Sequence, residues 1–123
     1  MIEHLRDFPD NVVAFVCSGR VTTRDYETVL VPVVEAALRQ HEKVRLYYQI
    51  ALDFSHIEPG VSQNFKVGME HLLRWDRIAI VTNVDWIRET LRAFSFLMPG
   101  AVEIFLLDEA VMAREWILDA DPP

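Results

Sequence analysis

The sequence predicts an α/β domain built on a mainly parallel sheet with helices on its faces. Two observations lead to this fold class. Apolar stretches such as Val12 to Cys17 are continuous rather than alternating, which is typical of strands covered on both sides. After a first pair of strands, predicted strands and amphipathic helices alternate along the chain. Right-handed crossovers between successive strands then place the helices over the sheet.

The first third of the chain contains two strands and a helix. Ile2 to Leu5 is predicted as a short strand, and Ser18-Gly19 ends the strand that begins at Val12. Thr22 and Asp25 resemble a capping box, with Asp in place of the usual Glu. Pro32 predicts a kink or a new helix start, because it lacks a backbone donor and clashes with the preceding turn. The helix that follows the cap has an apolar stripe at 3, 4, 3, 4 spacing: Tyr26, Val29, Leu30, Val33, Val34, Ala37 and Leu38.

The middle of the chain repeats this order. Val44 to Ile50 is predicted as a strand, and Asp53 to Gly60 is the longest irregular stretch. A helix is expected from about Val61 to Trp75, followed by a strand at Arg77 to Val81 and a turn at Thr82-Asn83. The inner positions of that helix are Phe65, Met69, Leu72 and Leu73.

Two helices and one strand complete the predicted fold. Asp85 is expected to cap one helix, and Pro99-Gly100 to end it. Val102 to Leu107 is the last predicted strand, and Asp108 is expected to cap the closing helix. The inward positions are Ile87, Leu91, Phe94 and Met98 on the first helix, and Ala110, Ala113 and Ile117 on the second.

Length and charge limit what the chain does. Its 123 residues fit one domain over residues 1–120, with a disordered tail at 121–123. The net charge of −7 disfavours nucleic acid and anionic membranes. A single cysteine, Cys17, fits a reducing compartment. The polar N-terminus predicts no signal peptide, and no apolar run predicts a transmembrane segment, so a cytoplasmic location is expected.

Four blocks of sequence resemble those of a known family. They are Asp25-Tyr26 with Pro32, Val44 to Tyr48, Lys66 and His71 with Arg77 to Val81, and Ala113 with Trp116-Ile117. The chain resembles the SpoIIAA-like proteins, small bacterial members of the STAS superfamily. Where that family carries Gly-Asp and then Trp after the apolar strand, this chain has Thr82-Asn83 and retains Trp86.

The resemblance implies a sheet of four to five strands, helices on both sides and an antiparallel first strand. The wider STAS superfamily includes anti-sigma-factor antagonists that are switched by phosphorylation of a serine in a D-S-[ST]-G motif. Ser55 lies near that position, but the region here reads DFSHIEPG and lacks the motif. A phosphate on Ser55 would lie near a predicted helix N-terminus.

Catalytic signatures are absent from the sequence. No nucleophile elbow, dinucleotide motif, P-loop or H-E-x-x-H pattern occurs, and the four histidines lack the spacing of metal ligands. We therefore predict no metal and no cofactor. Cys17 lies in an apolar strand, which favours an inert core residue over a nucleophile.

Two candidate sites follow from the predicted fold. Ligands bind beyond the carboxyl ends of parallel strands, where His56 and Asp53 could act as an acid–base pair. This crevice comprises Asp53, Phe54, Ser55, His56, Thr82 and Asn83. The alternative interpretation is that the polar residues at the strand ends only turn the chain.

A contact patch is predicted at Phe54, Phe96, Leu97 and Met98, for a dimer or a lipid-like molecule. Trp86 and Trp116 are assigned to the core.

These observations predict a non-enzymatic binding or regulatory module. Its ligand is expected to be a protein partner or an apolar, lipid-like small molecule, and the chain is expected to form a homo-oligomer, a dimer. The alternatives are a phospho-switched regulator that resembles an anti-sigma-factor antagonist, and a small enzyme that uses His56 and Asp53.

Overall fold

A five-stranded sheet organises the molecule. The structure is a computed structural model that describes residues 1–53, 55–57, 74–95 and 101–119. The strands run in the order β1-β2-β4-β6-β7. They are β1 (Ile2–His4), β2 (Val12–Cys17), β4 (Val44–Ile50), β6 (Trp75–Val81) and β7 (Ala101–Phe105). β1 pairs antiparallel with β2, and every other neighbouring pair is parallel, which confirms the predicted sheet.

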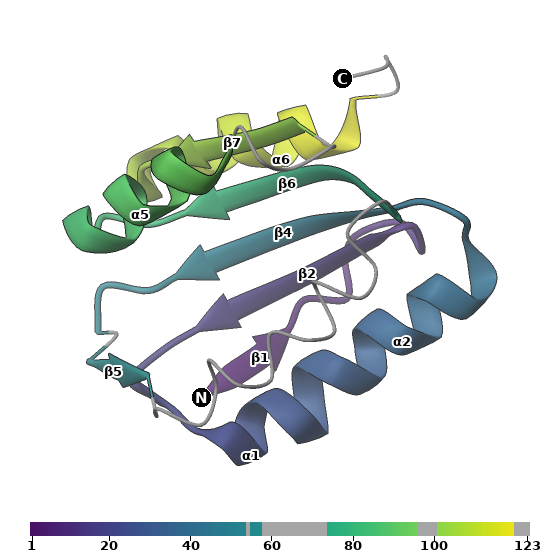
Figure 1. Ribbon diagram of the computed structural model, residues 1–123, viewed down its shortest axis with the longest axis horizontal. Coiled ribbons are helices and arrows are strands. Elements are labelled where there is room, and N and C mark those ends of the chain that lie inside the picture. The colour runs from purple at the N-terminus through teal and green to yellow at the C-terminus, as the bar shows by residue number, and fades with distance from the viewer. Residues whose placement is uncertain (54, 58–73, 96–100, 120–123) are drawn as a thin grey trace.

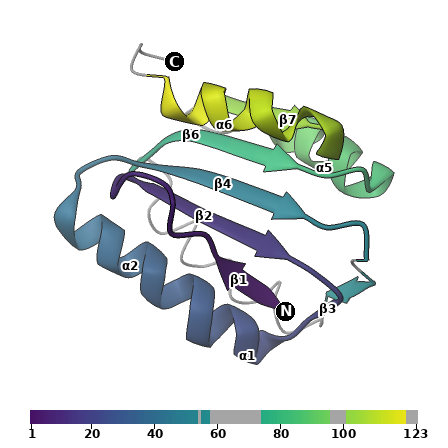
Figure 2. The same cartoon turned by 180° about the vertical axis from the view of Figure 1, so that it is seen from behind.

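Helices cover both faces of the sheet, as predicted. One face carries α1 (Thr23–Asp25), the π-helix η1 (Tyr26–Leu30), α2 (Val31–Gln40) and α5 (Asp85–Ser95). The other face carries α6 (Ala110–Leu118), which contacts β4, β6 and β7. Figures 1 and 2 show these two faces from opposite sides, with α2 in front in one view and α6 in front in the other.

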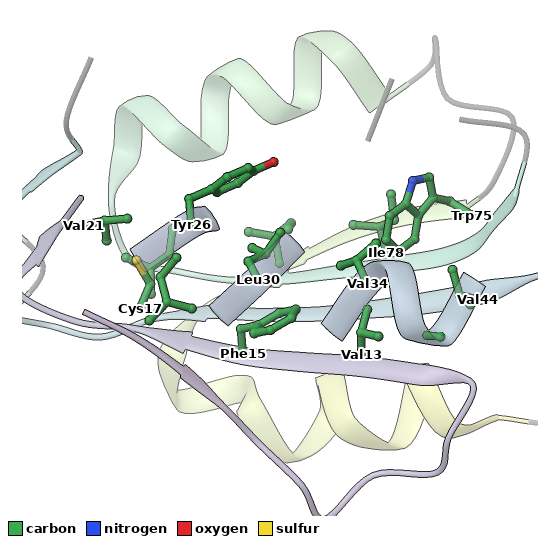
Figure 3. Close-up of a cluster of buried hydrophobic side chains, with 14 of the residues drawn as sticks. Val13, Phe15, Cys17, Val21, Tyr26, Leu30, Val34, Val44, Trp75 and Ile78 are labelled. Carbon is green, nitrogen blue, oxygen red and sulfur yellow. The ribbon is translucent and has the colours of Figure 1, made fainter. Parts of the chain in front are cut away.

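Each face has its own apolar core. The larger cluster lies between the sheet and the α2 side, with Phe15 and Cys17 from β2, Leu30 and Val34 from the helices, and Trp75 from β6 (Figure 3). The smaller cluster lies under α6 and comprises Val12, Ala14, Tyr47, Ala79, Val81, Ala113 and Ile117. Alternate residues of β2 therefore face opposite cores, which explains its continuous apolar sequence.

The predicted start of the first helix is confirmed. The Thr22 hydroxyl accepts a hydrogen bond from Asp25 N–H at 3.0 Å, and the Asp25 carboxylate accepts one from Thr22 N–H at 3.1 Å. The break expected at Pro32 is also present. A π-helical turn ends at Leu30 and α2 begins at Val31, so the proline lies in the first turn of a new helix, where its missing donor costs little.

Several predicted boundaries are wrong. Trp75 was assigned to a helix, but it is buried and begins β6, where it pairs with Val44. The stretch predicted as irregular contains the short strand β5 (His56–Ile57), which pairs in parallel with β3 (Arg20–Val21). The last strand ends at Phe105 rather than Leu107.

The caps assigned to two aspartates also differ. Helix α5 begins at Asp85 itself, so this carboxylate lies in the first turn, where it interacts favourably with the helix dipole. Asp108 lies within a 3-10 turn, η3 (Leu107–Glu109). The carboxylate that caps this region belongs to Glu109, which accepts a hydrogen bond from Leu106 N–H at 2.7 Å.

Trp86 was predicted to complete the core, and this prediction is wrong. Its side chain is 59% exposed, because it follows Asp85 on the outer side of α5 while Ile87 points inward. Trp116 is half-buried and packs against the smaller core, so its assignment is correct in part. The predicted helix from Val61, its inner residues, Met98 and the Pro99-Gly100 stop lie outside the described residues.

Candidate functional site

Beyond the sheet, β3 and β5 form a small parallel ribbon. β2 continues through Ser18 and Gly19 into β3, and Ala51 N–H donates to Cys17 O at 2.8 Å where β4 ends. Ser55 N–H donates to Gly19 O at 2.9 Å just before β5 begins. Gly19 has a φ of +56°, in the left-handed region that favours glycine. The hydrogen bond from Ser55 and the pairing of His56 with Arg20 therefore hold residues 55–57 against the segment that follows β2; β5 is labelled in Figure 1.

The predicted crevice residues separate into two groups. Asp53 and Ser55 are exposed near the ribbon, and the backbone of His56 pairs with Arg20 in it. Ser55 is followed by the strand β5. The helix N-terminus that was expected near Ser55 is therefore not found at residues 55–57. Phe54, and the contact patch of Phe96, Leu97 and Met98, lie outside the described residues. The acid–base pair of Asp53 and His56 stays a prediction.

Thr82 and Asn83 hold the turn after β6. Thr82 is fully buried, and its hydroxyl accepts a hydrogen bond from Val84 N–H at 3.1 Å. Its backbone N–H donates to Phe105 O at 2.9 Å. The Asn83 side-chain oxygen accepts a hydrogen bond from Leu107 N–H at 2.9 Å. Both residues thus tie β6 to the end of β7, and a ligand-binding role for them stays a prediction.

Cys17 lies in the larger core and is fully buried. Burial raises the pKa of its thiol, although a hydrogen bond with Tyr48 lowers that pKa in part. Burial also raises the pKa of Tyr48 well above its ordinary value. The thiol is therefore a poor nucleophile, as predicted from its apolar strand. Among residues 1–53, 55–57, 74–95 and 101–119 there is no group of three side chains arranged to hold a metal ion.

A shallow, open groove lies between β7 and α6 in the described part of the chain. Its volume is about 350 Å³. Four of its residues lie on α6 or just after it at i, i+3, i+4 and i+7 spacing, so they form one stripe beside the sheet edge. Glu103 and Phe105 of β7 form the opposite wall, two residues apart on one face of the strand. The stripe consists of Met112, Glu115, Trp116 and Asp119.

The groove combines an apolar floor with an acidic rim. The rings of Phe105 and Trp116 pack with centroids 6.1 Å apart, and Met112 is 57% exposed. Glu103, Glu115 and Asp119 are exposed carboxylates around this floor. Such a surface suits a ligand that carries both apolar groups and positive charge.

Buried Arg77 supports the groove from below. Its guanidinium lies 5.1 Å from the centre of the Trp116 ring and donates to Trp116 O at 2.6 Å. The same group lies 4.0 Å from the Asp119 carboxylate. Because Arg77 is only 3% exposed, it orients Trp116 and Asp119 without presenting its own charge at the surface.

The sequence contained a signal for this groove that was missed. Trp116 was assigned to the core and Phe105 to the last strand, and neither was placed in a site. The i, i+3, i+4, i+7 stripe on α6 mixes acidic and apolar residues, and it lies beside the inward stripe of Ala113 and Ile117. Recognising a second stripe on the same helix required knowing which strand lies next to it.

The five-stranded sheet with one antiparallel edge strand and helices on both faces defines a mixed α/β domain. The chain belongs to the SpoIIAA-like family, whose model matches residues 12–118. A solved structure of similar fold is that of an uncharacterized protein of the DUF3478 family, with a SpoIIAA-like fold, from Shewanella loihica PV-4. It is 23% identical, with a TM-score of 0.71, over 95% of this chain and 92% of that chain.

The resemblance inferred from sequence blocks is thereby confirmed at the level of family and fold. No curated protein matches the chain. In the ranges that the structure describes, no helix has both the length and the apolar character needed to cross a membrane.

Proposed function

We propose that this protein is a non-enzymatic binding module whose partner is another protein, and that the groove between β7 and α6 is the contact surface. The observation that carries the proposal is the apolar floor of Phe105, Met112 and Trp116 placed directly beside an edge strand. Aromatic and methionine side chains are enriched in protein interfaces, and those in this groove remain partly or largely exposed.

The surface around the groove extends its apolar character. Val111, Met112 and Leu118 are all exposed on α6, and Leu106 is exposed after β7. Exposed large apolar side chains gathered on and beside one short helix are typical of interaction sites. The groove residues themselves include no serine, cysteine or histidine that could act as a nucleophile, which favours recognition over catalysis.

A photo-reactive amino acid placed at one position of the groove tests the proposal in living cells. Met112 is replaced by p-benzoyl-phenylalanine, and the same residue is placed at Gln40, an exposed position of α2 on the opposite side of the sheet, as the matched control. We expect irradiation to give a discrete adduct with one identified protein at position 112 and none at position 40. Mass spectrometry of the adduct identifies the partner.

Three outcomes would contradict the proposal. Equal adducts at both positions would mean nonspecific contact, and no adduct at position 112 would mean that the groove is unoccupied. An adduct with a lipid would support the apolar small molecule instead. An adduct between two copies of this chain would identify the partner as the predicted homodimer and would locate its interface at this groove.

A further inference from the structure

We infer that the segment bound in this groove is extended and basic: a short stretch of a partner protein in which lysine or arginine alternates with other residues. It adds a strand to the open edge of β7. This inference rests on the proposed function and names the chemistry of the partner at the same site. Three independent properties of the groove carry it: its charge, its floor and its position at the sheet edge.

The charge of the rim selects a cation. Glu103 and Glu115 are exposed, and within the described ranges no cationic group lies within ion-pair distance of either carboxylate. Asp119, the third carboxylate of the rim, lies 4.0 Å from Arg77, so among the described residues the unpaired negative charge of the rim comes from Glu103 and Glu115. The chain as a whole has a net charge of −7, which also attracts a basic partner over longer range.

The floor suits the long stems of lysine and arginine. These side chains bury their methylene groups along apolar surface while the charged head stays in water beside a carboxylate. Met112 provides a flexible apolar contact, and the partly exposed rings of Phe105 and Trp116 can also attract a cation through their faces. A purely apolar ligand would leave the exposed carboxylates of Glu103 and Glu115 without a countercharge from the ligand.

The edge of the sheet supplies backbone pairing. β7 pairs with β6 on one side only, and no other strand among the described residues pairs with its outer side. An extended segment that hydrogen-bonds to this side presents every second side chain to the face that carries Glu103 and Phe105. This period of two explains why the basic residues of the partner must alternate with others.

A second copy of this chain fits the groove poorly. In a symmetric pair formed through β7, each copy would bring Glu103 and Glu115 toward the same carboxylates of the other copy. Like charges placed opposite each other across paired strands are destabilising. The same repulsion between carboxylates favours a basic segment of another protein over a second copy of this chain.

Synthetic peptides test the inference directly. The probe is the heptapeptide Lys-Val-Lys-Val-Lys-Val-Lys with blocked ends. It is compared with its glutamate counterpart and with two N-methylated versions, one methylated at the lysines and the other at the valines. We expect the lysine peptide to shift the backbone amide resonances of β7 and the indole N–H of Trp116, with weaker binding at higher salt. The glutamate peptide should not bind, and one of the two N-methylated versions should fail to bind because it lacks the backbone donors that face β7.

Two double variants with the same change of net charge, one in the groove and one outside it, test whether the rim selects the cation. In Glu103→Lys/Glu115→Lys we expect affinity for the lysine peptide to fall about tenfold, about 1.4 kcal/mol of binding free energy, while the glutamate peptide begins to bind. The control is Glu35→Lys/Glu89→Lys, which makes the same change of net charge on exposed positions of α2 and α5. A circular dichroism spectrum identical to that of the wild type shows that each variant is folded.

The results separate this inference from the proposed function. If the lysine peptide fails to bind, binds equally to both double variants, or binds equally well in both N-methylated versions, the extended basic partner is ruled out. Cross-linking of an identified protein at position 112 would then still support a binding module with a different partner chemistry. If cross-linking fails at position 112, the proposed function itself is wrong.

Discussion

At the scale of single residues, Arg77 connects the start of β6 to the end of α6. Its guanidinium donates to Trp116 O, while Arg45 from the neighbouring strand donates to Ile117 O at 3.0 Å. Arg45 in turn pairs with Asp76 at 2.8 Å. Carbonyl groups in the last turn of a helix lack partners within the helix, so two strand arginines satisfy the carboxyl end of α6.

Removing this contact should destabilise the protein. We expect Arg77→Met to lower the free energy of unfolding by about 2 kcal/mol, because a buried carbonyl loses a charged hydrogen-bond donor. Urea unfolding followed by circular dichroism measures the change. Arg92→Met, at an exposed position of α5, is the control and should be nearly neutral. Equal stability of the two variants would mean that Arg77 does not support α6.

Gly19 provides a second prediction at this scale. An added side chain would meet no atom within 4 Å, so only the φ of +56° opposes a substitution. We expect Gly19→Ala to cost about 1 kcal/mol in the free energy of unfolding, the penalty of a left-handed conformation for an L-residue. Gly19→Asn should cost less, since Asn tolerates this conformation. Thermal unfolding of both variants measures this order, and an unchanged stability in Gly19→Ala would contradict the conformational argument.

At the scale of elements, the capping box joins the start of the first helix to the N-terminus. The Asp25 carboxylate accepts from Thr22 N–H and lies 3.5 Å from the Met1 ammonium group. The hydrogen bond to Thr22 is the main cause of the lowered pKa of Asp25, and the nearby ammonium group adds to it. The charged form of Asp25 is therefore favoured in the folded state.

This lowered pKa predicts a pH dependence. The stability that Asp25 contributes is present above its ordinary pKa of 3.8 and is lost as the pH falls through the lower folded value. We expect the difference in unfolding free energy between the wild type and Asp25→Asn to be largest near neutral pH and to shrink in acid. Thr22→Ala should cost about 1 kcal/mol at neutral pH. A difference that is independent of pH would contradict this role of Asp25.

The elements themselves could largely be predicted, and the errors have physical causes. Continuous apolar runs identified β2, β4 and most of β6, because strands covered on both faces are apolar at every position. Trp75 was assigned to a helix because an amphipathic segment precedes it, but pairing with Val44 draws it into the sheet. The short β3–β5 ribbon has too few residues for any periodicity, and only its parallel pairing defines it.

At the scale of the whole molecule, the site was harder to predict than the fold. Trp86 was assigned to the core by its resemblance to a retained family position, but in the first turn of α5 it lies on the outer side of the helix, apart from the buried Ile87. The groove depends on α6 and β7 lying side by side, so the mixed acidic and apolar stripe of α6 could be recognised as a wall only once its neighbouring strand was known. The net charge of −7 predicted only that nucleic acid and anionic membranes are disfavoured, and it did not indicate where on the molecule a partner would bind.

The two walls of the groove, β7 and α6, are also the last elements that the ribosome makes among those described. Chains emerge with the N-terminal part first, so β1, β2 and β4 can pair before residues 101–119 have left the exit tunnel. Until then, β6 exposes the backbone groups that later pair with β7. The groove itself therefore forms only after both β7 and α6 have packed onto the rest of the sheet.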